Sequence, residues 1–208
     1  MTSASRMPRG RMGRLRLRHS LEVADRGAEL LDRKLRILRE EHTRLLRAAD
    51  AGARSWAEAL RRAELWLTRA VLLGGERPLD AAAADVGRAE VTVAQATTMG
   101  VRHPSAVGCV VPDRPATAAA PGNTALVHAE TAYRQALRAA AEYTALRAAA
   151  DLIGAEAQRT RRRVRALRHH WIPRLEAALT QVGQALEQDE HEDAVRRRWA
   201  ARTRSEQE

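Results

Sequence analysis

Small and apolar residues recur at alternating steps of four and three along the chain from Leu17 to Leu73. This period of 3.5 residues places them in one stripe along an α-helix, and a repeat sustained over so many heptads is typical of a coiled coil. Gly74 and Gly75, followed by Pro78, are residues that end a helix. The sequence therefore predicts one long N-terminal helix over residues 14–73.

A second long helix is predicted over residues 124–200. Asn123 precedes it and is suited to cap it, because its side-chain oxygen can accept a hydrogen bond from an amide of the first turn. Within this helix the segment TRRRVRALRHHWIPRLE, residues 160–176, contains Pro173. A proline in a helix interior lacks the amide donor and costs about 3 kcal/mol. The apolar steps around Pro173 also depart from the heptad, so we expect a kink or a local change of supercoil there.

Residues 74–123 differ in composition from both helices. Glycines and prolines punctuate this central insert, and two short valine-containing runs at residues 91–93 and 107–111 predict a small β-hairpin. Because the two long helices have similar lengths and the insert separates them, we expect them to pack as an antiparallel pair. The predicted fold is therefore mainly α-helical, a single elongated domain over residues 1–208 built on a long two-helix coiled coil.

The formal net charge of the chain is +10, and Lys34 is its only lysine. The densest group of arginines lies at positions 159, 161, 162, 163, 165 and 168. Such a group is either a solvated helix face, a contact for nucleic-acid phosphates, or a contact for the carboxylates of a protein partner. Consecutive arginines at 161–163 spread around most of a helical turn, which favours a helix surrounded by partners over one lying against a duplex.

The sequence contains no recognisable catalytic or cofactor motif. Neither GxxxxGK[ST] nor a GxGxxG after a strand occurs. The seven histidines lack metal-ligand spacing, and His169 and His170 point about 100° apart on a helix. Cys109, the only cysteine, sits in a valine-rich segment without a persuasive base partner and has no partner for an internal disulfide. We therefore expect no active site, no metal and no cofactor.

The sequence predicts neither a membrane span nor a signal peptide. No run of about 18 uncharged apolar residues occurs. The basic N-terminus is not followed by the apolar segment that a signal peptide needs. We therefore expect a soluble chain that is compatible with a reducing cytosol.

Three stretches together resemble one protein family. They are GRLRLRHSLEVADRGAELLDRKLRIL at residues 13–38, MGVRHP at residues 99–104 and TRRRVRALRHHWIPRLE at residues 160–176. Their content, order and spacing are similar to those of the D subunit of the V-type and archaeal-type (A-type) ATPases, and the resemblance covers nearly the whole chain. The chain departs from the family pattern at Arg165 and Arg168, where asparagine and glutamate are expected.

The resemblance implies a central-stalk rotor subunit of a rotary ATPase or ATP synthase. In this family two long helices form a left-handed coiled coil inside the ring of catalytic A and B subunits. The F subunit binds alongside, and an adaptor, called C in bacteria and d in eukaryotes, connects the stalk to the membrane ring. ATP sites lie between A and B, so the resemblance implies a non-catalytic chain without direct nucleotide or nucleic-acid binding.

Such a chain couples ATP synthesis or hydrolysis to proton or sodium translocation. It lies on the cytoplasmic face of the plasma membrane, as a peripheral part of the complex. The alternative is a basic coiled-coil protein that binds nucleic acid or serves as a scaffold.

The resemblance also implies which residues meet the partners. Residues 13–46 and 160–200 are expected within the ring, and residues 75–123 are expected to face the F subunit and the adaptor. The arginines expected to contact the A and B subunits are Arg161, Arg162, Arg163 and Arg174. The residues expected to hold the two helices together, which we call the predicted seam, are Leu21, Leu31, Leu35, Leu38, Val164, Leu167, Trp171 and Leu175.

Overall fold

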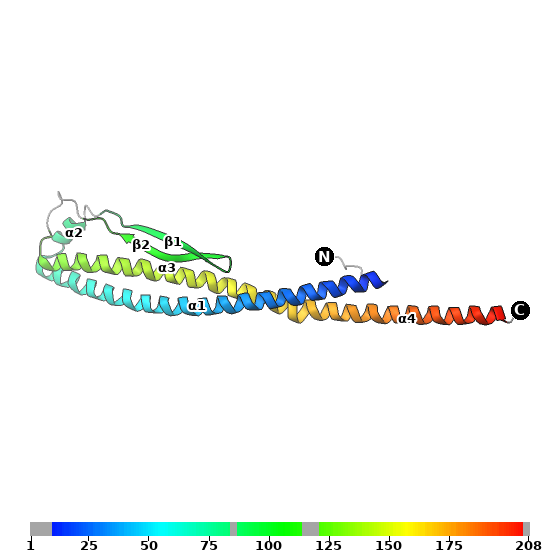
Figure 1. Cartoon of the computed structure of the whole chain (residues 1–208). Helices are drawn as coiled ribbons and strands as arrows, with labels where there is room; N and C mark the ends of the chain where they lie inside the picture. The colour runs from blue at the N-terminus through cyan, green and yellow to red at the C-terminus, as the bar shows by residue number, and fades with distance from the viewer. Residues whose placement is uncertain (1–9, 84–86, 114–120, 206–208) are drawn as a thin grey trace. The chain divides into compact units, whose positions relative to one another are not determined.

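The computed structural model of the protein describes residues 10–83, 87–113 and 121–205 (Figure 1). Long helices occupy both ends of the chain, and a two-stranded antiparallel sheet lies between them in sequence, which confirms the predicted fold class. Parts of the predicted insert, residues 84–86 and 114–120, lie outside the described residues. The elements are α1 (Gly10–Gly74), α2 (Arg77–Ala83), β1 (Glu90–Thr98), β2 (Val101–Val110), α3 (Thr124–Ala166), the π-helical turn η1 (Leu167–Trp171) and α4 (Ile172–Ser205).

The predicted end of α1 is confirmed. Gly75, directly after the helix, has φ of +72°, and its amide N–H donates to the carbonyl oxygen of Val71 at 2.8 Å. A residue in the left-handed region at this position satisfies a carbonyl of the last turn, and glycine adopts it without the steric penalty of a Cβ. The Gly74-Gly75 pair therefore terminates the helix through its backbone conformation.

Asn123 caps α3 as predicted. Its Oδ1 accepts a hydrogen bond from the amide N–H of Leu126 at 2.8 Å, which satisfies a donor of the first turn. Its Nδ2 donates to the carbonyl oxygen of Ala70, near the end of α1, at 3.1 Å. One side chain thus starts α3 and fixes that start beside the last turns of α1.

The predicted β-hairpin is confirmed, with strands longer than the valine runs that indicated it. Val93 pairs with Val107, the register shifts by one residue between Ala94 and Gln95, and the pairing then continues to the turn at Met99 and Gly100. These two residues have φ of 51° and 83°. Two consecutive positive φ values are the mark of a type I′ turn, whose twist matches that of the paired strands.

The backbone contacts divide the chain into two compact units. Unit 1 comprises residues 1–35 and 159–208, and unit 2 comprises residues 36–158. α1 and α3 each contribute residues to both units. The single domain over residues 1–208 stays a prediction.

In unit 2, α1 and α3 run antiparallel. Near one end of the pair a Cβ built on Gly154 would lie 2.6 Å from Nε2 of His42, so only glycine fits against that ring without a shift. Further along α1, Trp56 stacks on Tyr143 with ring centroids 5.7 Å apart. The next aromatic pair joins Trp66 and His128, at 4.5 Å. Along the series His42, Trp56, Trp66 on α1 the residue numbers rise, while the numbers of the partner residues on α3 fall. This order is the one that antiparallel packing requires.

In unit 1, α1 packs antiparallel on η1 and α4. Arg11 of α1 forms an ion pair with Glu190 of α4 at 2.8 Å, and Asp32, further along α1, pairs with Arg168 of η1. Between these pairs lies an apolar core. Its buried members are Leu17, Ala24, Leu175, Ala178 and Val182.

Most residues of the predicted seam are buried or half-buried. Its buried members are Leu35, Leu38, Val164 and Leu175, and its half-buried members are Leu21, Leu31 and Leu167. Trp171 differs from the prediction, because half of its side-chain surface, 50%, is exposed. The neighbouring Ile172 packs against the core of unit 1 in its place.

The π-helical turn η1 explains this correction. The amide N–H of Ile172 donates to the carbonyl oxygen of Leu167, five residues earlier, rather than four residues earlier as in an α-helix. The wider turn accommodates one extra residue, so the step along the buried face runs from Leu167 to Ile172 and then to Leu175. Trp171 is rotated out of that face. The irregularity predicted near Pro173 therefore takes the form of a π-turn directly before the proline.

Candidate partner-binding surface

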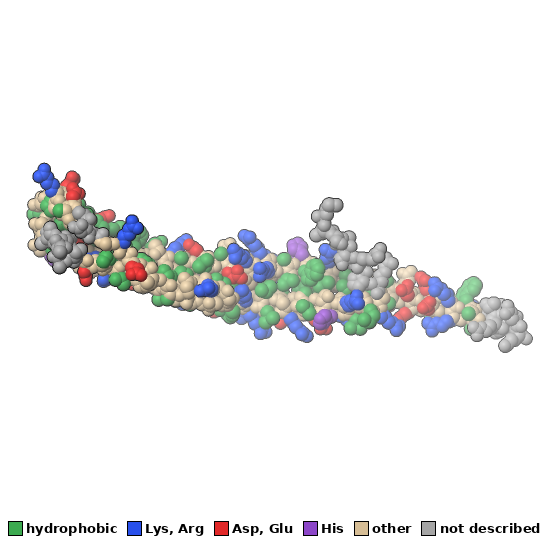
Figure 2. All heavy atoms as spheres, turned by 90° about the horizontal axis from the view of Figure 1, so that it is seen from above, with side chains coloured by type: hydrophobic (Ala, Val, Ile, Leu, Met, Phe, Trp, Pro, Cys, Tyr) green, Lys and Arg blue, Asp and Glu red, His purple; other side chains and the backbone are tan. Residues whose placement is uncertain are grey.

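The positive charge of the chain is concentrated in unit 1. Residues 1–35 and 159–208 contain 21 arginines and lysines against 12 aspartates and glutamates, an excess of nine. Residues 36–158 contain 15 against 14, an excess of one. Figure 2 shows blue side chains together with green hydrophobic ones on the visible face of the molecule. The two units therefore present surfaces of different electrostatic character.

Arg161, Arg162 and Arg163 surround the exposed side of α3. The buried residues on either side of them, Thr160 and Val164, face the packed interior, and all three arginines are exposed. At about 100° per residue, Arg162 points away from the buried face, while Arg161 and Arg163 border it on opposite sides. The guanidinium groups therefore reach outward over most of the helix circumference that solvent can reach.

These guanidinium groups are available to a partner. Within the part of the chain that the structure describes, Arg161, Arg162, Arg163 and Arg174 form no hydrogen bond or ion pair. A guanidinium offers five donors in a planar fork that matches a carboxylate, and it keeps its charge at any physiological pH. The arrangement suits recognition of acidic side chains on more than one side of the helix.

Arg168, from the same arginine cluster, has a structural partner instead. Its Nη2 bonds Oδ2 of Asp32, so it links η1 to α1 within unit 1. Sequence reasoning grouped Arg168 with the other arginines of residues 159–168. What distinguishes Arg168 from the other arginines is its position in the antiparallel packing, which brings Asp32 of α1 opposite the π-turn.

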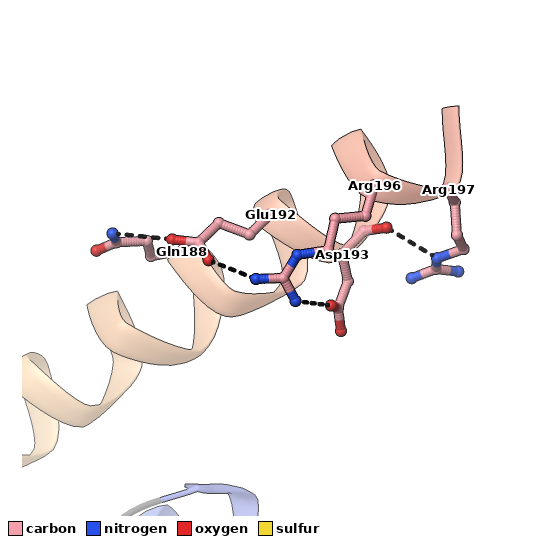
Figure 3. Close-up of polar contacts among 5 residues, drawn as sticks. All are labelled: Gln188, Glu192, Asp193, Arg196 and Arg197. Atoms are coloured by element: carbon pink, nitrogen blue, oxygen red, sulfur yellow. Dashed lines mark hydrogen bonds and ion pairs between the residues drawn. The ribbon is translucent and has the colours of Figure 1, made fainter. Parts of the chain in front are cut away.

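Two acidic residues in the C-terminal half of α4, Glu192 and Asp193, are used within the helix itself (Figure 3). Arg196 reaches Glu192 and Asp193 at 3.4 Å each, and Gln188 donates to Glu192 at 3.3 Å. Arg197 donates to the backbone carbonyl of Asp193 at 3.2 Å. Exposed pairs at this spacing add only about 0.3–0.5 kcal/mol each, but together they favour the helical conformation of this segment.

Unit 2 contains a different polar cluster, where the hairpin lies near α1. Arg44 donates to both carboxylate oxygens of Glu41, at 2.8 and 2.6 Å. This bidentate bond holds the pKa of Glu41 below its usual value; partial burial opposes the shift, and the charges of Arg44 and His103 add to it. His103 of β2 is only 4% exposed, and its ring nitrogens hydrogen-bond the hydroxyl of Thr98 and the carbonyl oxygen of Pro104, each at 2.9 Å.

Glu41→Gln is expected to lower the free energy of unfolding by about 0.5–1 kcal/mol at pH 7, because it removes a charged hydrogen-bond acceptor at a partly exposed site. The folded-state pKa of Glu41 is depressed, so its carboxylate stabilises the fold above the unfolded pKa. That contribution is lost as pH falls through the folded pKa. The difference between wild type and variant should therefore disappear as the pH falls well below about 4.

Urea unfolding followed by circular dichroism between pH 7 and pH 2.5 measures this difference. Glu40→Gln is the matched control, since Glu40 is exposed and forms no ion pair within the described part of the chain. A Glu41→Gln deficit that stays constant over the whole pH range would contradict the electrostatic origin.

Unit 2 also contains an apolar cavity of about 400 Å³. It is bounded by α1, α2 and α3, and at its rim Arg134 pairs with Asp113 at 2.9 Å and Glu130 at 3.0 Å. The aliphatic and aromatic side chains that line it include Leu67, Leu79, Leu126, Tyr133 and Leu137.

The described residues form neither a metal-binding cluster nor a membrane-spanning helix. No cluster of three or more histidine, cysteine, aspartate or glutamate side chains there has the geometry to hold a metal ion. Within the same residues, no helix has a stretch both long and apolar enough to cross a bilayer.

A family model that describes the D subunit of ATP synthases matches residues 14–202, a span that includes both long helices and the hairpin. The chain belongs to the ATP synthase D-subunit family. The resemblance that the sequence indicated is therefore confirmed.

Several named relatives agree with this family. The D subunit of the V-type ATP synthase of Anaeromyxobacter dehalogenans (strain 2CP-C) is 33% identical over 207 residues, covering 95% of this chain and 97% of the relative. The protein of the same name from Anaeromyxobacter sp. (strain Fw109-5) is 32% identical over 203 residues, covering 95% and 94%. The D subunit of the A-type ATP synthase of Methanopyrus kandleri is 30% identical over 196 residues, covering 89% and 82%.

Proposed function

We propose that this D-family chain is the central-stalk rotor subunit of a V/A-type rotary ATPase or ATP synthase. The observation that supports this most directly is the family match over residues 14–202, together with relatives named as the D subunits of V-type and A-type ATP synthases. The chain then couples ATP synthesis or hydrolysis at the catalytic A and B subunits to proton or sodium translocation by the membrane ring. It does not itself catalyse the reaction.

The physical requirement on such a subunit is asymmetry. Three otherwise equivalent catalytic sites adopt different states only if the subunit in their centre contacts each of them differently. A helix pair with different side chains on its different faces meets that requirement. The excess of nine positive charges in unit 1 supports placing this unit within the ring, with Arg161, Arg162, Arg163 and Arg174 contacting carboxylates of A and B.

Unit 2 then faces the F subunit and the adaptor that leads to the membrane ring. Its near-neutral charge balance and its apolar cavity favour contacts of a different kind from those of unit 1. The complex, and this chain as a peripheral part of it, lies on the cytoplasmic face of the plasma membrane.

The decisive experiment combines purification with a coupled assay. Tagged wild-type chain, expressed with the A, B and F subunits and the adaptor of its source organism, is expected to purify with them. Leu35→Asp together with Leu167→Asp is expected to reduce rotation-coupled ATP turnover by about tenfold or more, because two carboxylates at the helix interface disturb the pairing of α1 with η1.

Leu65→Asp together with Leu152→Asp is the matched control. These leucines lie on α1 and α3 and are 51% and 47% exposed, so the same substitutions there leave the helix pair intact. If the Leu35→Asp, Leu167→Asp chain supports assembly and coupled turnover as well as wild type, the rotor proposal is wrong.

A further inference from the structure

The apolar cavity of unit 2 has the size and lining of a small-molecule site. Its volume of about 400 Å³ lies within the range of roughly 300–1,000 Å³ that is typical of such sites. Leu126 and Ala129, which line it from α3, are buried, whereas Tyr133 and Leu137, further along the same helix, are 36% and 40% exposed. The cavity is therefore deepest near Leu126 and opens towards Leu137.

The cavity is also elongated. Its lining residues on α3 recur every three or four positions from Leu126 to Leu137, so they follow one face of the helix for roughly 16 Å. Leu67 of α1 and Leu79 and Ala82 of α2 line the cavity as well. A long apolar slot of this kind suits an alkyl chain.

Two charged side chains, Glu130 and Arg134, line the cavity among the described residues. Nη2 of Arg134 bonds Oε1 of Glu130 at 3.0 Å, and both side chains are half-buried. Nη1 of the same guanidinium bonds Oδ1 of Asp113 at 2.9 Å, but the Asp113 side chain is 98% exposed. An ion pair with so exposed a partner contributes little free energy. The Nη1 position is therefore one at which another anion can replace Asp113.

The donor at this position selects the head group of a ligand. A guanidinium matches a carboxylate in geometry and charge, and such charge-assisted hydrogen bonds are stronger than neutral ones. A cationic head group would be repelled by Arg134, and a neutral one would lose the charge-assisted bond. The complementary ligand is an alkyl chain with a carboxylate at one end.

We propose that this cavity binds a medium-chain fatty acid, with its alkyl chain between α1, α2 and α3 and its carboxylate on Nη1 of Arg134 in place of Asp113. The inference goes beyond the proposed function and does not depend on it, since it concerns unit 2 of the chain alone. A bound acid fills the interior of the cavity and leaves the outer surface of unit 2 to its protein partners.

Calorimetric titration of the full-length chain with decanoate, below the concentration at which decanoate forms micelles, tests the proposal. Wild type is expected to bind one decanoate per chain. Octanoate should bind about tenfold more weakly, because it buries two fewer methylene groups. The neutral 1-decanol should also bind about tenfold more weakly, because it cannot form the charge-assisted bond to Arg134.

Three substitutions separate the head group from the alkyl chain. Arg134→Gln is expected to weaken decanoate binding about tenfold or more, and Asp113→Asn to strengthen it about threefold, because the competing carboxylate is removed. Ala82→Leu fills part of the cavity and should weaken binding of decanoate and 1-decanol alike. Arg147→Gln is the matched control, because Arg147 is an ion-paired arginine of α3 that does not line the cavity. Circular dichroism checks that each variant is folded.

Several results would overturn the proposal. Absence of decanoate binding would do so, as would 1-decanol binding as tightly as decanoate. Binding that Arg134→Gln leaves unchanged, or that Asp113→Asn weakens, would show that Arg134 does not hold the carboxylate. If decanoate does not bind, but NMR signals of the methyl groups that line the cavity shift when the adaptor or the F subunit is added, the occupant is a side chain of a partner instead.

Discussion

Deletion of His170 is expected to lower the free energy of unfolding by about 3 kcal/mol, and Pro173→Ala in the same chain is expected to restore most of it. His170 is an exposed residue of the π-turn η1, so its deletion removes the extra residue that this turn accommodates. The segment then becomes a regular α-helix with Ile172 still on the buried face. The proline, however, now lies in an uninterrupted helix interior, where its ring clashes with the preceding turn.

Deletion of Gln181 is the control. Gln181 is an exposed residue of α4, outside any irregular turn. Its removal rotates the following residues by about 100°, which takes the buried Val182 out of the core and costs a comparable amount, about 2–3 kcal/mol. Here Pro173→Ala is expected to give no specific recovery, because the proline is still preceded by the π-turn.

A double-mutant cycle on urea unfolding measures the difference. The coupling between the His170 deletion and Pro173→Ala should be about 2–3 kcal/mol, and the coupling between the Gln181 deletion and Pro173→Ala should be near zero. Equal couplings in the two cycles would show that the π-turn does not serve to accommodate the proline.

Leu38→Asp is expected to lower the free energy of unfolding by about 4 kcal/mol at pH 7. The Leu38 side chain is fully buried, at 0% exposure, so the substitution removes apolar contacts and places a carboxyl group where water does not reach it. Burial disfavours the charged form, so part of the loss should be recovered at pH 3, where the carboxyl group is neutral in the unfolded chain as well.

Ile37→Asp is the adjacent control for this substitution. Ile37 is 40% exposed, so an aspartate at this position keeps its carboxylate in contact with water. The substitution should therefore lower the free energy of unfolding by less than about 1 kcal/mol. Urea unfolding monitored by circular dichroism compares both variants with wild type. Similar losses at the two positions would mean that helix propensity rather than burial decides the effect at Leu38.

The features that could be predicted from the sequence are those set by local chemistry. Glycine at the end of α1 and asparagine before α3 act through their own backbone or side chain within one helical turn. The valine runs indicated the hairpin for a similar reason, since β-branched residues favour extended backbone. Family membership could also be predicted, because the matching stretches are contiguous in sequence.

The helical apolar stripe and the family resemblance placed Trp171 at the helix interface, and neither identified the role of Arg168. The positions of both side chains depend on the helix geometry before Pro173, where a single π-turn shifts the buried positions by one residue along the sequence. Periodicity assumes a constant number of residues per turn and cannot show where that number changes. Which arginine meets Asp32 likewise depends on the register between two helices that are far apart in sequence.

Local sequence patterns sufficed to predict two long helices with a hairpin between them in the sequence, the end of the first helix, the start of the second, and the family. Which side chains lie between the helices and which remain outside depended on tertiary packing. Helix formation depends on residues within a turn or two of one another. The choice of the buried face depends on packing against a partner helix, and that packing placed Ile172 inside, left Trp171 half exposed, and left Val23 and Leu30 exposed on α1.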